Sequence, residues 1–206
     1  MNHALALIEF EGVAAGVLAV DRMLKRSPVA LLRCGTVHPG RYLALVGGSV
    51  ASTEEAHAAG VGIGCDEGAL TDEVLLPDPH PALSAAVGGE RRAPRAEAVG
   101  VLEISSSPGL LRVVDAVLKA VPVDLVEVRL ADDLGGRALA ILDGTLADVE
   151  QALAMAPEIL RDRARVLGSS LLPRLDETLR GVLAAGSSFG TCATVEPKGA
   201  EKLEEV

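Results

Sequence analysis

An α+β fold of two tandem βαββαβ units, each followed by a terminal helix, is predicted by three features of the sequence. The design of residues 4–34 returns in residues 98–128. Strand-like and helix-like patterns alternate in the same order in both copies. Hydrophobic residues make up 49% of the 206 residues but aromatic residues only 1%. The core must therefore be built from Ala, Val and Leu, which favour close packing of helices on sheets.

The internal repeat defines the unit of folding. An offset of 94 positions (103 − 9 and 122 − 28) joins four chemically different pairs: Glu9 with Glu103, Asp21 with Asp115, Lys25 with Lys119 and Pro28 with Pro122. From Gly40 and Gly136 onward the offset is 96 (136 − 40), so one loop of the second copy holds two extra residues. The sequence therefore predicts a pseudosymmetric building block whose distinctive chemistry lies where the copies differ.

The first copy opens with a strand over residues 4–10 and a helix over 13–26, where apolar residues recur at three and four positions. Pro28 blocks continuation of that helix. Residues 29–34 are typical of a buried strand, and the turn TVHPG joins them to an antiparallel partner at 41–46. A β-hairpin is therefore expected.

The first copy continues with a helix expected over residues 52–64. Gly60, Gly62 and Gly64 disfavour it, because each costs up to about 1 kcal/mol relative to Ala. A strand near 70–76 and a short helix after the turn PDPHP complete the pattern.

The second copy repeats this order. We expect strands near 97–104, 123–131, 137–143 and 165–172, and helices near 108–120, 146–163 and 175–184. The segment GGERRAPRAE between the copies is polar and contains proline, as a connector should. The predicted division is a first domain at 1–89, a linker at 90–96, a second domain at 97–186 and a flexible tail at 187–206.

Composition and charge argue against several classes of function. A net charge of −10 and the scarcity of aromatic side chains disfavour nucleic-acid binding. No apolar run reaches the roughly 18 residues of a membrane-spanning helix, and the start lacks a signal-peptide pattern, so a cytosolic protein is expected. Cys34, Cys65 and Cys192 show no metal-type spacing and are expected to be free, buried thiols.

Isolated carboxylates and histidines give no sign of an enzyme. Glu9 and Glu103 could suggest acid–base catalysis, but no nucleophile or substrate pocket accompanies them in the sequence. They are expected to cap or pair at the ends of their strands. His3, His57 and His80 have no ligand spacing, so surface or turn positions are expected for them.

Motifs that occur in both copies give residues 4–186 a family resemblance. They are the opening strands ALIE and GVLE, the helix ends DRMLKRSPV and DAVLKAVPV, hairpins ending in GG or DG, and the turns LPDPHP and LPRLD. In this order, twice, they resemble tandem-domain shell proteins of bacterial microcompartments. The resemblance implies two unpermuted ferredoxin-like domains and a homotrimer that forms a pseudohexagonal tile. Such tiles join other shell proteins, hexamers and pentamers, around enclosed enzymes.

The segment TVHPGRYLALVGG is especially similar to the trimers of propanediol-type compartments. There a cysteine before Pro-Gly-Lys holds an iron–sulfur cluster at the central pore, whereas this chain has His38. Imidazole replaces thiolate as a cluster ligand only in particular centres. Three His38 side chains on a trimer axis could instead hold zinc or copper, or they could be solvated pore residues.

The same resemblance implies which residues line the pore: His38, Pro39, Gly40, Asp132, Asp133, Leu134, Gly135 and Gly136. In a trimer, Asp132 and Asp133 would bring six carboxylates near the opening and attract cations, unless arginine side chains offset them. Arg41 and Arg137 follow the loop glycines and could do so. The two aspartates could equally be ordinary turn residues.

The edge of the tile is implied by a second group of residues. Lys25 and Lys119 match the lysine that packs against its counterpart on the next tile, and Arg174 matches a companion basic residue. Asp78 departs from this pattern in the first copy.

Three functions remain in view. The resemblance favours a non-enzymatic shell tile whose pore passes small metabolites, ions or electrons. A redox module would carry a metal ion or iron–sulfur cluster through His38. A small-molecule sensor would bind its ligand at an interface between paired ferredoxin-like domains.

Overall fold

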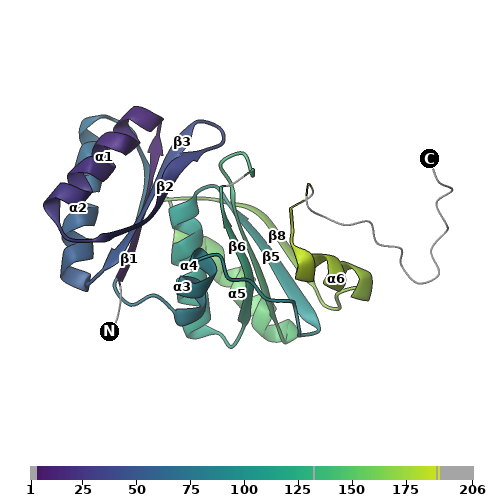
Figure 1. Cartoon of the computed structure of the whole chain (residues 1–206). Helices are drawn as coiled ribbons and strands as arrows, with labels where there is room; N and C mark the ends of the chain where they lie inside the picture. The colour runs from purple at the N-terminus through teal and green to yellow at the C-terminus, as the bar shows by residue number, and fades with distance from the viewer. Residues whose placement is uncertain (1–3, 132, 189, 191–206) are drawn as a thin grey trace, which may run out of the picture.

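The computed structural model describes residues 4–131, 133–188 and 190, which form two four-stranded antiparallel sheets covered by helices (Figure 1). The first half contains β1 (Ala4–Glu11), α1 (Val13–Arg26), β2 (Ala30–Val37), β3 (Arg41–Gly48), α2 (Val50–Asp66), β4 (Leu70–Leu76) and α3 (Pro81–Val87). The second contains β5 (Ala98–Ile104), α4 (Ser107–Ala120), β6 (Asp124–Leu130), β7 (Ala138–Gly144), α5 (Leu146–Leu160), β8 (Val166–Leu172) and α6 (Glu177–Ala185).

The two halves share one topology, which confirms the predicted α+β class and element order. The first sheet has the strand order β2-β3-β1-β4, and the second has the matching order β6-β7-β5-β8. Helix α5 ends at Leu160, earlier than the expected residue 163, because Arg161 takes a φ of 50° that a helix cannot continue. The predicted tail at 187–206 lies almost entirely outside the described residues.

Helices α1 and α2 pack on one face of the first sheet. That face presents Ile8 and Phe10 from β1. A Cβ on Gly60 would lie 2.7 Å from the Ile8 side chain, and one on Gly64 would lie 3.1 Å from the Phe10 ring. The glycines that disfavour this helix in isolation therefore let α2 approach the sheet closely.

The other face of the first sheet packs against the second half of the chain. Leu7, Leu43 and Val74 belong to the same buried cluster as Leu110 and Leu111 of α4. Helix α4 thus lies between the two sheets, and α3 packs beside it against β6 (Figure 1). One apolar core joins the halves.

The segment between α3 and β5 is fixed to the second sheet. The backbone N–H groups of Arg95 and Ala96 donate to the Asp143 carboxylate at 2.5 and 2.8 Å, and Arg92 pairs with the same carboxylate. Within the described part of the chain, no helix combines the length and the apolar character needed to span a membrane.

Candidate functional site: the hairpin loops and the interface between the halves

The loop between β2 and β3 holds His38, Pro39 and Gly40, all of which are exposed. The Gly40 N–H donates to the Val37 carbonyl oxygen at 3.0 Å and closes the turn. Gly40 has a φ of 101°, which is readily adopted only by glycine. The His38–Pro39 peptide bond is cis. The sequence therefore places the His38 imidazole at the tip of a tight hairpin.

The matching loop between β6 and β7 is the longer one. Gly135 and Gly136 have φ values of 61° and 79°, and Asp133 also lies in the left-handed region at 57°. Asp133 is exposed and Leu134 is half-buried. Asp132, which is predicted to line the pore, lies outside the described residues.

The two loops lie side by side at one end of the molecule (Figure 1). A Cβ placed on Gly136 would lie 3.1 Å from Cδ of Pro39 and 3.3 Å from Nη1 of Arg41. The structure thus brings together the loops that the sequence assigned to one opening, and a glycine at 136 permits their contact.

Glu9 joins the halves immediately behind these loops. Its Oε1 accepts a 2.6 Å hydrogen bond from Nη1 of Arg41, and its Oε2 accepts one of 2.9 Å from the N–H of Ser107 at the start of α4. Burial raises the pKa of this carboxyl, although the Ser107 N–H and the Arg41 guanidinium both act to lower it. Glu9 pairs and caps, as expected, but the helix it caps belongs to the other half.

A second polar group crosses the same interface between β4 and α4. The Ser106 hydroxyl donates to the Asp72 carboxylate, and Nη2 of Arg112 donates to the Glu73 carbonyl oxygen while lying 3.5 Å from Asp72. Nη1 of Arg163 lies 2.8 Å from the Glu73 carboxylate. The sequence analysis did not single out these residues. The sequence feature that could have identified them is that most of them lie at positions where the two copies differ.

A third group joins the end of α4 to the turn before α3. Nζ of Lys119 donates to Asp115 at 2.7 Å and to the carbonyl oxygen of Asp78 at 2.5 Å. The N–H of His80 donates to the other Asp115 oxygen at 2.7 Å, and the His80 imidazole caps α3. Lys119 therefore holds the halves together while part of its side chain remains exposed.

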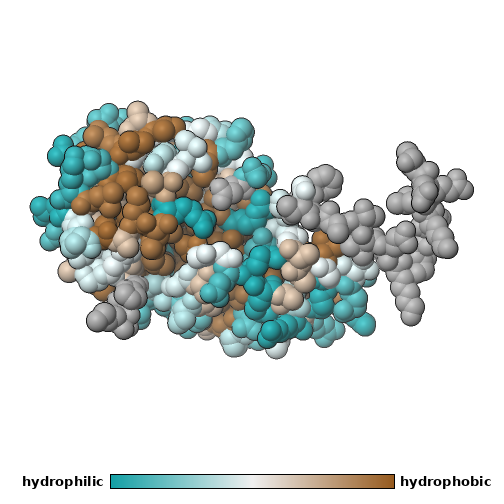
Figure 2. Space-filling model, viewed as in Figure 1, coloured by the Kyte–Doolittle hydropathy of each residue, from teal (hydrophilic) through white to brown (hydrophobic). Residues whose placement is uncertain are grey.

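We define the internal interface as these three polar groups together with the apolar contacts of α4 with the first sheet and of α3 with β6. The surface of α1 that matches the buried surface of α4 is exposed in the single chain. Val17 of α1 is 52% exposed, whereas its match Leu111 in α4 is 1% exposed. Leu24 and its match Leu118 are 42% and 8% exposed. Figure 2 shows hydrophobic surface gathered over this first half of the molecule.

The polar groups of the internal interface also have open counterparts. Glu103 lies 3.6 Å from Arg137, and its side chain is 39% exposed, whereas the Glu9 side chain is 0% exposed. Lys25 and Asp21 form an exposed pair at 2.7 Å. Helix α1 begins after Gly12, which supplies no side-chain cap. Glu103 thus matches the helix-capping Glu9 in sequence, but in the described part of the chain its carboxylate is paired only with Arg137.

The remaining candidate residues are dispersed. Arg174 and Asp78 are exposed in matching turns. Cys65 is exposed, where a buried thiol was expected. His57 was expected at the surface or in a turn, but it lies within α2 with its side chain 15% exposed and 2.9 Å from Glu73. His3 and Cys192 lie outside the described residues.

The donors near the loop do not fit a cysteine-ligated iron–sulfur cluster. His38 stands where a thiolate is needed, and Cys34 packs on the helix-covered face of the first sheet. In the described ranges, no three His, Cys, Asp or Glu side chains of one chain gather into a metal-binding group.

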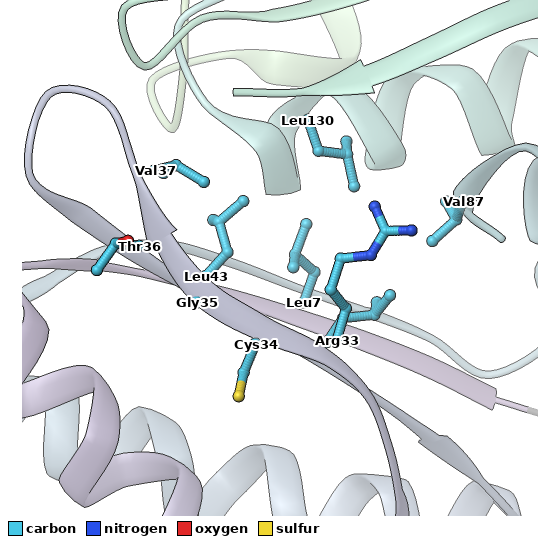
Figure 3. Close-up of a pocket in the computed structure, with 10 residues that line it drawn as sticks. Leu7, Arg33, Cys34, Gly35, Thr36, Val37, Leu43, Val87 and Leu130 are labelled. Carbon is cyan, nitrogen blue, oxygen red and sulfur yellow. The ribbon is translucent and has the colours of Figure 1, made fainter. Parts of the chain in front are cut away.

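A cavity of about 220 Å³ lies between the first sheet and the second half (Figure 3). Leu7, Leu43, Val87 and Leu130 line it, and the Arg33 side chain reaches across it, whereas Cys34 points to the opposite side of β2. This is the space that a sensor would use for a ligand.

Comparisons with known proteins agree with the duplicated fold. The BMC domain model matches residues 4–79 and again 98–175. Over 179 residues the chain is 31% identical to the bacterial microcompartment shell protein PduT of Citrobacter freundii, covering 87% of this chain and 96% of that protein. Over 200 residues it is 30% identical to the carboxysome assembly protein CcmO of a Synechocystis species, covering 88% of this chain and 65% of that protein.

Solved structures show the same likeness. A microcompartment protein from Desulfitobacterium hafniense superposes with a TM-score of 0.75 at 29% identity, over 88% of this chain and 99% of its own. The fused permuted hexameric shell protein MSM0275 of the RMM microcompartment shares the fold, with a TM-score of 0.55 at 20% identity over 79% of this chain and 83% of its own.

Two successive BMC domains and paired hairpin loops define the class as tandem-domain shell proteins. The chain belongs to the BMC-domain family and is a structural shell protein of a bacterial microcompartment rather than an enzyme.

Proposed function

We propose that three copies of this chain close head to tail into a pseudohexagonal tile of the shell, with the hairpin loops around its central opening. The observation that carries this proposal is the unequal exposure of matched surfaces. Helix α4 is covered by the first half of its own chain, whereas the matching face of α1 leaves Val17 and Leu24 exposed. Repeating the relation between the halves from chain to chain would cover α1 in the same way.

The short helices support the same arrangement. Leu83 of α3 is 0% exposed at the internal interface, whereas its match in α6, Leu179, is 40% exposed. Leu31 on β2 is exposed, whereas the matching Leu125 on β6 is buried under α3. Helix α6 of one chain would therefore cover β2 of the next, and α1 would pack beside it.

The tile's opening is proposed to pass small metabolites, ions or electrons. Gly136, Pro39 and Arg41 hold the two loops together, so three chains would supply six loops around one axis. Exposed Asp133 and the guanidinium groups of Arg41 and Arg137 place both signs of charge near the loops. Small polar solutes are the cargo class that this surface suits.

Contacts between tiles are proposed at the ends of the matched helices. Lys25 and Lys119 lie at the last turns of α1 and α4, and Arg174 and Asp78 lie in the neighbouring turns. Lys119 also belongs to the internal interface, where its Nζ donates to the Asp78 carbonyl oxygen. It would therefore serve both that interface and the contact between tiles. Other shell proteins, hexamers and pentamers, are the partners that such edges would meet.

The decisive measurement is the mass of the protein in solution, followed by electron microscopy of its assemblies. We expect about three times the 21.1 kDa of one chain, and flat arrays with hexagonal spacing. Val17→Asp should yield single chains, because it puts a carboxylate on the open face of α1. Leu146→Asp, at an exposed apolar residue outside the proposed contact, should keep the trimer. A monomeric unmodified protein, or a trimeric Val17→Asp variant, would contradict the proposal.

His38 favours one additional role, because its exposed position at a hairpin tip would bring three imidazoles to the axis of a trimer. A zinc or copper ion is the cargo that such a set would hold. Metal analysis of untagged protein should then give one ion per three chains, absent from His38→Ala. No metal in either protein would leave a pore without a metal.

A further inference from the structure

A closed ring would contain two kinds of interface, and the matched residues of these interfaces differ in chemistry. The internal interface uses Asp72, Glu73, Ser106 and Arg112. At offsets of 96 for the strand and 94 for the helix, the residues that would meet between chains are Gly168, Ser169, Gly12 and Leu18. We name Asp72, Ser106 and Arg112 the polar set, and their matches Gly168, Gly12 and Leu18 the apolar set.

Within the chain, the members of the polar set pair with one another across the two halves, although Nη1 of Arg112 is buried without a hydrogen-bond partner. Asp72 and Ser106 are buried, and the Ser106 hydroxyl donates to the Asp72 carboxylate. The Arg112 guanidinium reaches the Glu73 carbonyl oxygen and lies 3.5 Å from Asp72. Each charge therefore depends on a partner that the other half supplies.

The apolar set lacks both sides of these pairs. Gly168 replaces the carboxylate of Asp72, and Gly12 replaces the hydroxyl of Ser106. Leu18 replaces Arg112 and is exposed in the single chain. Because donor and acceptor are missing together, an interface between chains would bury no unpaired charge.

Other contacts are common to both interfaces and cannot tell them apart. Glu9 and Arg41 correspond to Glu103 and Arg137, and the Asp115–Lys119 pair corresponds to the exposed pair of α1. These shared residues fix a common geometry. The polar and apolar sets, in contrast, differ between the two interfaces.

We propose that the two sets enforce alternation of first and second halves around the ring by penalising contacts between like halves. This inference rests on the proposed head-to-tail tile. If a first half packed on another first half, buried Asp72 would face Gly12 and Leu18. If a second half packed on another second half, Arg112 would face Gly168. Each wrong pairing buries a charge without its partner, which is costly.

The test transplants one pair of the polar set into the interface between chains. Leu18→Arg should weaken trimer formation at least tenfold, because its guanidinium would face Gly168. Leu18→Arg with Gly168→Asp should restore the trimer. Within one chain α1 packs on β1, β2, β3 and α2, whereas β8 packs on β5 and α5, so only a contact between chains can produce the rescue.

The added carboxylate has a precedent in the first half, where Asp72 stands near Glu9. The matched control is Leu18→Arg with Gly62→Asp, which has the same net charge but places the carboxylate on α2, where nothing crowds it. It should remain as weak as Leu18→Arg alone. Sedimentation over a concentration series measures the trimer, and circular dichroism confirms that each variant is folded.

The outcomes separate the two proposals. An unmodified protein that forms no trimer overturns the head-to-tail tile. A trimeric unmodified protein whose Leu18→Arg variant associates normally, or whose Gly168→Asp rescue fails or is matched by Gly62→Asp, overturns the alternation mechanism while leaving the tile intact.

Discussion

Helices α1 and α4 occupy matched positions in the two halves, yet only α4 is covered on both sides. Both end in the same Asp-x-x-x-Lys pattern, and both pack one face on their own sheet. The outer face of α4 packs on the first sheet, and Glu9 caps the N-terminus of this helix. On the outer face of α1, Val17, Leu18 and Leu24 are exposed among the described residues. The packing of α4 thus shows the kind of contact that α1 lacks in the single chain.

The cores beneath these helices differ in a compensating way. Gly16 of α1 lies under the Tyr42 ring, and a Cβ at this position would be 2.4 Å from it. In the second half, Leu110 takes the place of the glycine and Ala138 takes the place of the tyrosine. The large side chain is thus on the strand in the first half and on the helix in the second, so two different sequences fill equivalent space.

The largest losses of unfolding free energy should come from substitutions that change the size of the side chains at Gly16 and Tyr42. Tyr42→Ala should cost about 3 to 5 kcal/mol of unfolding free energy through lost burial, and Gly16→Leu should cost about 3 kcal/mol through overpacking. The double variant should cost clearly less than the sum, because it copies the second half. Urea unfolding of the four proteins measures this. Additive losses would show that the two cores are not interchangeable.

Glu9 and Glu103 provide the next comparison. Glu9→Ala should cost about 2 to 3 kcal/mol in a single chain, because it leaves the Ser107 N–H without its acceptor and removes the shorter ion pair of Arg41, which keeps only Glu11 at 3.6 Å. Glu103→Ala should cost below about 1 kcal/mol, since its pair with Arg137 is partly exposed. Thermal unfolding in a Val17→Asp background isolates the single chain. Equal losses would mean that capping across the internal interface contributes nothing.

The sequence predicted the fold well because the signals were local and occurred twice. Apolar spacing and proline positions located the helices, and the repeat confirmed their order. How closely α2 packs on the first sheet was less predictable, because Gly60 weakens an isolated helix but permits close contact with Ile8 of the sheet. The pairing of Asp72 with Ser106 was not predictable, since it depends on how the two halves pack.

A smaller effect should be a pH dependence of stability that comes from Glu73, whose carboxyl meets His57 of its own half and Arg163 of the other. The His57 imidazole, with a further contribution from Arg163, lowers the pKa of Glu73 from 4.5 to about 2. A carboxyl with a lowered pKa stabilises the fold above its ordinary value and loses that contribution as pH falls through the folded value. The unmodified protein should therefore lose about 1 to 2 kcal/mol between about pH 4.5 and 2 that Glu73→Gln does not lose.

The matched position in the second half is Ser169, which has no charge to titrate. Ser169→Ala is therefore the control, and its stability should follow the unmodified protein at every pH. Urea unfolding of the three proteins from pH 7 to pH 2 gives the comparison. If Glu73→Gln runs parallel to the unmodified protein over this range, then the charge on Glu73 does not stabilise the fold, and its contacts with His57 and Arg163 are worth little.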